Sequence, residues 1–433
     1  MTKTLELYVH IPFCVKKCSY CDFLSFPVDE ATQDKYTQAL LKEIAYYGAK
    51  MKDCSISTIF IGGGTPSWLD ESNMLQILDA IHKNFEVSRD AEITMECNPG
   101  TLTMQKLVSY RNAGVNRLSI GLQSADDEEL KILGRIHTFN QFLKTYEMAR
   151  EAGFTNINVD LISGIPYQTA EKFLKTLKTV VRLKPNHISA YTLIVEEGTP
   201  FYEEYRADVN RQKHGMPTSF LPDEDETYRI YKLTQQYMLE RGYEQYEISN
   251  FAQMGCECKH NIGYWTRDNY LGVGLGAASL IDNVRYSNTR DLHEYINIVM
   301  GNNKVNDRNT LPVNNEGCEG DIVSYDSSYV GIMDKKFSQE DGAVAIGTNL
   351  HEAVEKVSRK AQMEEYMFLG LRMKQGVTRE GFEKEFGIPV EGVYSEVIEH
   401  LRAEGLLEMS EGRIYLTDKG MDLGTYSMSQ FLL

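Results

Sequence analysis

Six short apolar runs, rich in β-branched and aromatic residues, alternate with segments of helical periodicity in the first part of the chain. The runs are 5–13, 57–64, 91–99, 117–124, 156–166 and 187–195. Several are almost continuously apolar, as strands buried on both faces of a sheet are. The segments between them, such as DKYTQALLKEIAYYGAK, place apolar residues on one helical face. Six strand–helix units in series predict an α/β fold, in which right-handed crossovers curl a parallel sheet into a partial (β/α)6 barrel.

The pattern changes twice after the sixth run. Residues 1–300 are expected to form the barrel with an accessory extension, which contains a helix over 225–242 and a glycine-rich strand over 270–280. Residues 301–350 are polar, lack sustained periodicity and are interpreted as an insertion or linker. Residues 351–433 predict a small C-terminal domain with helices near 360–372, 378–386 and 391–404, followed by a hairpin over 405–420. That order is typical of a winged helix.

The charge of the chain argues against DNA binding, which is the common function of a winged helix. The chain carries a net charge of −17, and residues 378–433 hold eleven acidic and five basic side chains. Nucleic-acid binding needs clustered lysine and arginine, so we expect no nucleic-acid partner. No apolar run is long enough to span a bilayer, and the first residues do not resemble a signal peptide. We therefore expect a cytoplasmic protein, in which clustered cysteines indicate a metal site rather than disulfides.

The cysteines at positions 14, 18 and 21 have the spacing C-x3-C-x2-C. Three closely spaced thiolates can ligate three irons of a [4Fe–4S] cubane and leave the fourth iron open. A zinc site that lacks a nearby fourth ligand and a buried, reduced triplet are the alternatives. The spacing favours Cys14, Cys18 and Cys21 as iron–sulfur ligands.

Polar and glycine residues gather at the ends of the predicted strands, where the function of a parallel barrel is located. Gly63, Gly64 and Thr65 follow the second run, and Glu96 lies in the third. The carboxylate of Glu96 needs a cationic or hydrogen-bonding partner in an otherwise apolar strand, and a purely structural role is its alternative. Gln123 and Asp160 belong to the next two runs. The sequence predicts one shared site at this edge and identifies no catalytic residue.

Seven motifs carry a family resemblance: YVHIPFCVKKCSYCDF, IGGGTPS, ECNPGT, NRLSIGLQS, LGRIHT, NVDLISGIPYQT and HNIGYW. Over roughly 5–300 and 360–433, the chain resembles the radical S-adenosylmethionine (SAM) superfamily and, within it, the oxygen-independent coproporphyrinogen III oxidase-like family. The resemblance implies that the open iron of the cluster binds SAM. It assigns SAM contacts to Tyr8, Gly63, Gly64, Thr65, Glu96, Gln123, Arg135 and Asp160. A tyrosine of the core is the alternative for Tyr8.

Two features point to the heme chaperones of HemW type within that family rather than to its decarboxylating dehydrogenases. Phe23 stands where the dehydrogenases have a fourth cysteine, and their long segment before the cluster is missing here. The motif HNIGYW is similar to one of the chaperones, which makes His260, or else Cys258, a candidate heme ligand. A helix start with core aromatics is the alternative for this motif.

The resemblance therefore implies a protein that binds heme and transfers it to an acceptor. The alternative is radical SAM oxidative decarboxylation of coproporphyrinogen III in porphyrin biosynthesis. The partners that it implies are heme, an unknown heme-acceptor protein, an electron donor such as flavodoxin or ferredoxin, and peripheral contact with membrane respiratory proteins.

Overall fold

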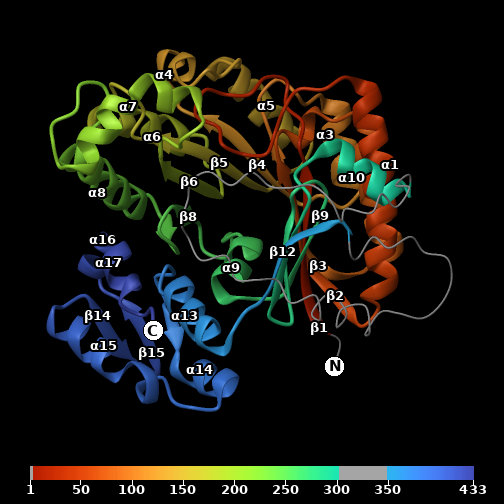
Figure 1. Cartoon of the computed structure of the whole chain (residues 1–433). Helices are drawn as coiled ribbons and strands as arrows, with labels where there is room; N and C mark the ends of the chain where they lie inside the picture. Colours follow the sequence, from red (N-terminus) through yellow and green to blue (C-terminus); the bar gives the residue numbers. More distant parts are fainter. Residues whose placement is uncertain (1–2, 302–348) are drawn as a thin grey trace, which may run out of the picture.

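A computed structural model describes residues 3–301 and 349–433. Its centre is a run of six parallel strands that are neighbours in chain order (Figure 1). They are β1 (Lys3–Ile11), β2 (Cys54–Gly63), β3 (Glu86–Cys97), β4 (Arg117–Gln123), β5 (Asn156–Ser163) and β6 (His187–Thr192). The α/β class and the parallel sheet of a partial barrel are confirmed. The expected insertion at 301–350 lies almost wholly outside the described residues.

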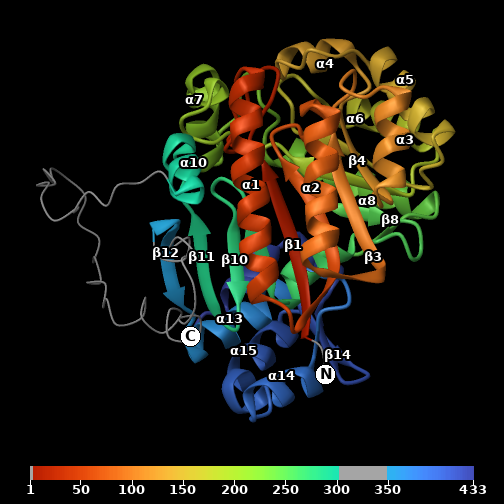
Figure 2. The ribbon, with the colours of Figure 1, turned by 90° about the vertical axis from the view of Figure 1, so that its right-hand side faces the viewer.

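Helices between these strands cover the outer face of the sheet. They are α1 (Glu30–Lys50), α2 (Glu71–Asn84), α3 (Met104–Asn112), α4 (Asp127–Ile132), α5 (Phe139–Glu151) and α6 (Ala170–Val181), with a single 3-10 turn, η1 (Pro66–Trp68). Figure 2 shows α1 and α2 side by side over the strands. Aspartate or threonine caps the start of each α-helix; the side chain of Asp29, for example, accepts from the backbone N–H of Thr32.

Additional strands extend the sheet at both edges. Beyond β1 lie β9 (Tyr270–Val273), β10 (Ala278–Ile281), β11 (Val284–Asn288) and β12 (His351–Lys356); beyond β6 lie β8 (Asn250–Ala252) and β7 (Glu244–Gln245). β9 runs parallel to β1, and a Cβ at Gly274 would lie 2.6 Å from the Tyr36 hydroxyl oxygen, so this glycine permits close packing. β12 pairs with β11, although the sequence analysis assigned residues from 351 onward to the C-terminal domain.

The C-terminal domain has its own apolar core and a three-stranded sheet. It contains α13 (Arg359–Gly370), β13 (Val377–Thr378), α14 (Arg379–Phe386), α15 (Glu391–Ala403), β14 (Leu407–Ser410), β15 (Arg413–Leu416), α16 (Asp418–Asp422) and α17 (Gly424–Ser429). Three helices followed by a hairpin is the order that the sequence predicts.

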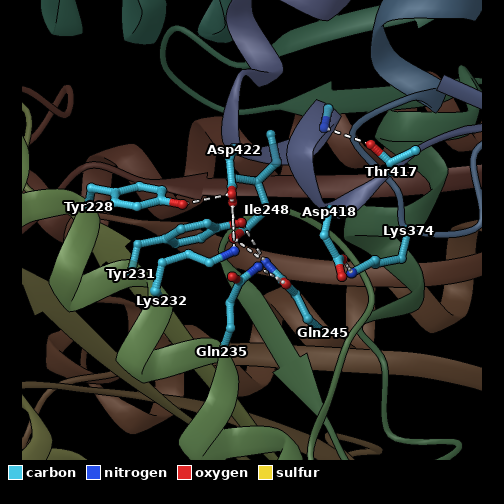
Figure 3. Close-up of polar contacts among 11 residues, drawn as sticks. Tyr228, Tyr231, Lys232, Gln235, Gln245, Ile248, Lys374, Thr417, Asp418 and Asp422 are labelled. Atoms are coloured by element: carbon cyan, nitrogen blue, oxygen red, sulfur yellow. Dashed lines mark hydrogen bonds and ion pairs between the residues drawn. The ribbon is translucent and has the colours of Figure 1, made fainter. Parts of the chain in front are cut away.

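This domain lies against α8 (Glu224–Glu240) and α9 (Lys259–Thr266) (Figure 1). Asp422 accepts hydrogen bonds from the Tyr228 hydroxyl at 3.0 Å and from the Lys232 ammonium at 3.0 and 3.1 Å (Figure 3). After α9, the guanidinium of Arg267 lies 3.0 Å from Glu365 and 3.1 Å from Glu385. Two further helices, α7 (Pro200–Lys213) and α10 (Leu292–Met300), flank the barrel. Within the described ranges, no helix is both long and apolar enough to cross a membrane.

Candidate functional site

A cavity of about 570 Å³, called the central cavity below, lies at the carboxyl ends of the parallel strands. Its wall includes every sequence-predicted cluster and SAM residue except Tyr8, namely Cys14, Cys18, Cys21, Gly63, Gly64, Thr65, Glu96, Gln123, Arg135 and Asp160. All but Arg135 come from β1 to β5 or the loops that follow them, and Arg135 lies between α4 and α5. The volume falls in the usual range of small-molecule sites. The shared site expected from the strand ends is therefore present as one continuous space.

The cysteines lie on the loop between β1 and α1. Within this loop, the Cys14 N–H donates to the Phe26 carbonyl at 3.2 Å, and the Ser19 N–H ties it to the segment after α4 by donating to the Leu133 carbonyl at 3.2 Å. The Cys21 N–H donates to the Cys18 carbonyl, which makes a tight turn that places two of the thiols. The loop thus presents all three cysteines to the central cavity from one side.

The three thiols fit a cluster better than a single ion. In the described part of the chain, no three histidine, cysteine, aspartate or glutamate side chains converge closely enough to hold one metal ion. A cubane cluster does not need such convergence, since each thiolate binds a different iron. Burial raises the pKa of the Cys14 thiol, so a metal that bound it would have to displace its proton.

The glycines after β2 allow the backbone to run close to the cysteine loop. A Cβ at Gly64 would lie 2.6 Å from the Phe13 carbonyl oxygen, and Gly63 adopts a φ of +117°. The next residue, Thr65, donates its N–H to the same Phe13 carbonyl at 2.7 Å. The GGG segment is therefore a structural necessity here as well as a wall of the central cavity.

Two carboxylates, Glu96 and Asp160, form a polar part of the wall of the central cavity. Glu96 Oε2 accepts from the Gly63 N–H at 3.0 Å, which supplies the partner that the sequence analysis required. Burial, and then the charge of Asp160, raises the pKa of Glu96 to about 8. Asp160 accepts from the Ser119 hydroxyl and the Asn158 amide, each at 2.8 Å, although burial still raises its pKa. A polar ligand that reaches both carboxylates would favour their ionised forms.

Asn98 connects two parts of the site and was missed by the sequence analysis. Its amide nitrogen donates to Thr65 Oγ1 at 2.7 Å, and its amide oxygen accepts from Arg135 Nη2 at 2.7 Å. Arg135 also donates to the Gly121 carbonyl at 2.9 Å and approaches Cys18 Sγ at 3.6 Å. The only signal was that Asn98 belongs to the ECNPGT motif, which gives no indication of its partners.

Three buried polar atoms of the wall have no partner among the described residues: Arg117 Nε, Arg135 Nε and Gln123 Oε1. Gln123 also has a left-handed φ of 69°, where the register between β4 and β5 shifts. A buried donor and a buried acceptor without partners are costly, and a strained residue often marks a functional site. The wall is therefore suited to a ligand with both a carboxylate and a donor group, such as SAM.

Tyr8, which the resemblance assigns to SAM, is not among the residues that line the central cavity. Its hydroxyl shares a hydrogen bond with His10 Nδ1 at 2.9 Å, and its ring stacks on Phe60 at 6.3 Å. Phe60, which pairs with Tyr8 across β1 and β2, itself lines the central cavity. The alternative of a packed tyrosine agrees with this arrangement.

Comparison with known proteins gives a consistent assignment. Residues 8–180 match the radical SAM superfamily, and residues 357–423 match the HemN C-terminal domain. A protein of Bacillus subtilis, "Heme chaperone HemW", is 34% identical over 98% of this chain and 98% of its own length. A Lactococcus lactis protein with the same name is 33% identical over 100% of this chain and 98% of its own length. The chain belongs to the HemW family.

The fold agrees with this membership. The structure of coproporphyrinogen III oxidase (HemN) from Escherichia coli, described as a radical SAM enzyme, superimposes with a TM-score of 0.76 at 22% identity. The match covers 99% of this chain and 90% of that one. This member of the HemW family is thus a radical SAM protein with a HemN-type C-terminal domain.

The HNIGYW motif of this HemW-family chain lies in α9, and its histidine is buried and has no contact with the central cavity. The His260 side chain is 1% exposed, with Nδ1 2.7 Å from Thr58 Oγ1 and Nε2 3.0 Å from the Tyr264 hydroxyl. Its ring stacks on Phe60 at 5.2 Å, one layer behind the wall of the central cavity. In this arrangement neither ring nitrogen is free to bind iron.

Cys258, the other candidate heme ligand, is also fully buried. Its thiol approaches Glu92 Oε1 at 3.5 Å, and burial raises its pKa to about 12. Arg117, which is 2% exposed, lies in the wall of the central cavity and supplies the positive charge next to this group. The sequence alone could not show that Cys258 is buried, because a motif does not indicate whether its residues line the cavity or lie behind the residues that do.

Proposed function

We propose that this protein is a heme chaperone, which binds heme and transfers it to an acceptor protein. One observation carries the proposal: two relatives named heme chaperone HemW match essentially the whole chain, barrel and C-terminal domain together, at 33–34% identity. A match over one domain would support shared chemistry only. A match over both supports a shared function.

We further propose that Cys14, Cys18 and Cys21 hold a [4Fe–4S] cluster and that SAM occupies the central cavity beside it. When bound, a reduced cluster supplies the electron that cleaves SAM. The chain's own part is positioning: Gly63, Gly64 and Thr65 offer backbone groups to the methionine portion. The guanidinium of Arg135 is suited to the carboxylate, for which its unpartnered Nε is an available donor.

The remaining polar wall would orient the other groups of SAM. Glu96 and Gln123 offer acceptors to the amino or ribose groups, and Asp160 would meet the adenosine end. All of these residues line the central cavity. The electron donor is proposed to be a small redox protein of the flavodoxin or ferredoxin class, because the cluster must be reduced from outside.

The alternative, decarboxylation of coproporphyrinogen III, has less support. The likeness to HemN is at 22% identity and concerns the fold alone. The fourth cysteine expected for a dehydrogenase is replaced by Phe23. Ligation of heme by His260 also stays a proposal, since it requires that the hydrogen bonds to Thr58 and Tyr264 open first.

The test compares two reactions of one preparation. Anaerobically reconstituted protein is titrated with heme while the Soret band is followed, and a second portion is incubated with coproporphyrinogen III, SAM and a reductant. We expect saturable heme binding, transfer of the heme to an apoprotein, and no decarboxylated product. Turnover to protoporphyrinogen IX, or the absence of any heme binding, would refute the chaperone assignment.

A further inference from the structure

Large apolar side chains stand exposed around the mouth of the central cavity. Phe23 is 68% exposed and Ile194 is 69% exposed, while Tyr191 is 42% exposed. All three line the central cavity, Phe23 from the cysteine loop and the other two from the end of β6 and the loop that follows it. An apolar group at the rim of a pocket typically marks a binding surface. We call these three side chains the rim.

Two lysines stand beside the rim on the cysteine loop. Lys16 and Lys17 are exposed and line the same mouth, and Lys17 Nζ donates to the Phe23 carbonyl at 3.0 Å. This bond places an ammonium group next to an exposed phenyl ring. Asp22 and Glu196 are the acidic side chains that accompany them at the mouth. In a chain of net charge −17, two adjacent cations at a cavity mouth are a local exception.

We propose that the rim is where this protein receives heme: the apolar macrocycle rests on Phe23, Ile194 and Tyr191, and its propionates face Lys16 and Lys17. The inference rests on the proposed chaperone function and assigns its docking site. Heme is a flat apolar ring with two carboxylates on one edge, and the rim offers apolar side chains with two cations on one side.

A larger cleft of about 1190 Å³ is less suited to a dianionic ring. It lies between α7, α8 and the C-terminal domain and shares Thr192, Leu193, Ile194 and Glu196 with the central cavity. Five acidic side chains line it, against only two lysines. The charge in this cleft would repel propionates, whereas the lysines beside the rim attract them.

Binding of heme at the rim does not require His260 to be uncovered. His260 is one layer behind Phe60 and is hydrogen-bonded at both nitrogens. Ligation by that histidine would be a later step, after α9 has opened. Reception at the rim and ligation at His260 therefore make separate predictions.

The experiment titrates cluster-loaded protein with heme and with heme dimethyl ester, whose carboxylates are neutral. The apolar pair Phe23→Ser/Ile194→Ser is compared with Leu239→Ser/Met254→Ser, which alters equally or more exposed apolar residues elsewhere. The charge pair Lys16→Gln/Lys17→Gln is compared with Lys175→Gln/Lys178→Gln on the exposed side of α6. Iron and SAM content are measured for every variant so that heme is counted per intact site.

We expect the apolar pair of substitutions to lower the affinity for both heme and its dimethyl ester by about tenfold or more. The charge pair of substitutions should lower the affinity for heme by about tenfold and leave the affinity for the ester unchanged. Neither control variant should differ from the wild type in these affinities. If wild-type protein binds no heme, the chaperone function itself is wrong. If heme binds normally to both variant pairs, or if they impair only reduction of the cluster by flavodoxin, the rim is not the heme site and this inference is overturned.

Discussion

The amide oxygen of Asn98 accepts a hydrogen bond from Arg135 Nη2 at 2.7 Å, and the same side chain holds Thr65 from its other end. Asn98 thus fixes two groups that line the central cavity. Replacing it by Ala should lower SAM affinity by about tenfold, because both partners lose a buried hydrogen bond and become free to rotate. Isothermal titration of the cluster-loaded protein measures this. Asn84→Ala, which removes a similar half-buried amide at the end of α2, is the control and should bind SAM normally.

The pKa of Glu96, about 8 in the ligand-free protein, predicts a pH dependence of SAM binding. Below that value the carboxyl is mostly protonated, so binding to its ionised form must release a proton. Affinity should then rise by up to about tenfold per pH unit between 6 and 8 and level off above 8. The amino group of SAM titrates in the same range, so the informative quantity is the difference from Glu96→Gln. Parallel pH profiles of the two proteins would contradict this role.

Substitution of the three loop cysteines should lower the iron content of the protein, whereas substitution of other cysteines should not. Cys14→Ala, Cys18→Ala and Cys21→Ala should each lose the cluster after anaerobic reconstitution, because three thiolates are the fewest that can hold it at this loop. Cys54→Ala and Cys256→Ala remove partly exposed cysteines outside the central cavity and serve as controls. Iron, sulfide and the EPR signal of the reduced protein are the measurements. A normal cluster in Cys18→Ala protein would rule out the assigned ligand set.

Tyr264→Phe tests whether His260 ligates heme. The substitution removes the hydroxyl 3.0 Å from Nε2 and leaves that nitrogen free, while the ring and its packing are kept. If imidazole binds the iron, the variant should bind heme several-fold more tightly, and His260→Ala should shift its Soret band. Phe substitution of Tyr270, which packs on Tyr264, controls for the loss of a nearby hydroxyl. A Soret band that responds to neither Tyr264 nor His260 would place the ligand elsewhere.

Glu6 predicts a stability difference that depends on pH. Burial, followed by the charge of Asp268, raises its pKa to about 9, and Oε2 has no hydrogen-bond partner in the described chain. A carboxyl with a raised pKa stabilises the fold at low pH and loses that contribution as pH rises toward the folded-state value. The free energy of unfolding of the Glu6→Gln variant should therefore rise relative to that of the wild type, by up to about 1.4 kcal/mol per pH unit between pH 6 and 9. Denaturant unfolding at several pH values measures this, and a constant difference would contradict it.

The hydrophobic periodicity of the sequence was sufficient to predict the strands and helices of the fold. It was not sufficient to predict which side chains contact one another. The six strands, the C-terminal helices and the converging polar positions follow from local patterns, since burial on one or two faces leaves a repeat in the sequence. The side-chain partners of Asn98 and His260 could not be predicted because they depend on residues far along the chain: His260 meets Thr58 across 202 positions. β12 escaped prediction because a half-exposed edge strand lacks a strong apolar pattern.

The eight residues of α9 serve both halves of the protein at once. Asn261, near its start, lines the central cavity, while Trp265, near its end, stacks on Arg372 of the C-terminal domain at 4.3 Å. A helix of two turns moves as a rigid rod, so a tilt imposed at one end is felt at the other. If an acceptor that shifts the C-terminal domain changes the free energy of SAM binding, thermodynamic linkage requires that SAM change the affinity for that acceptor by the same factor.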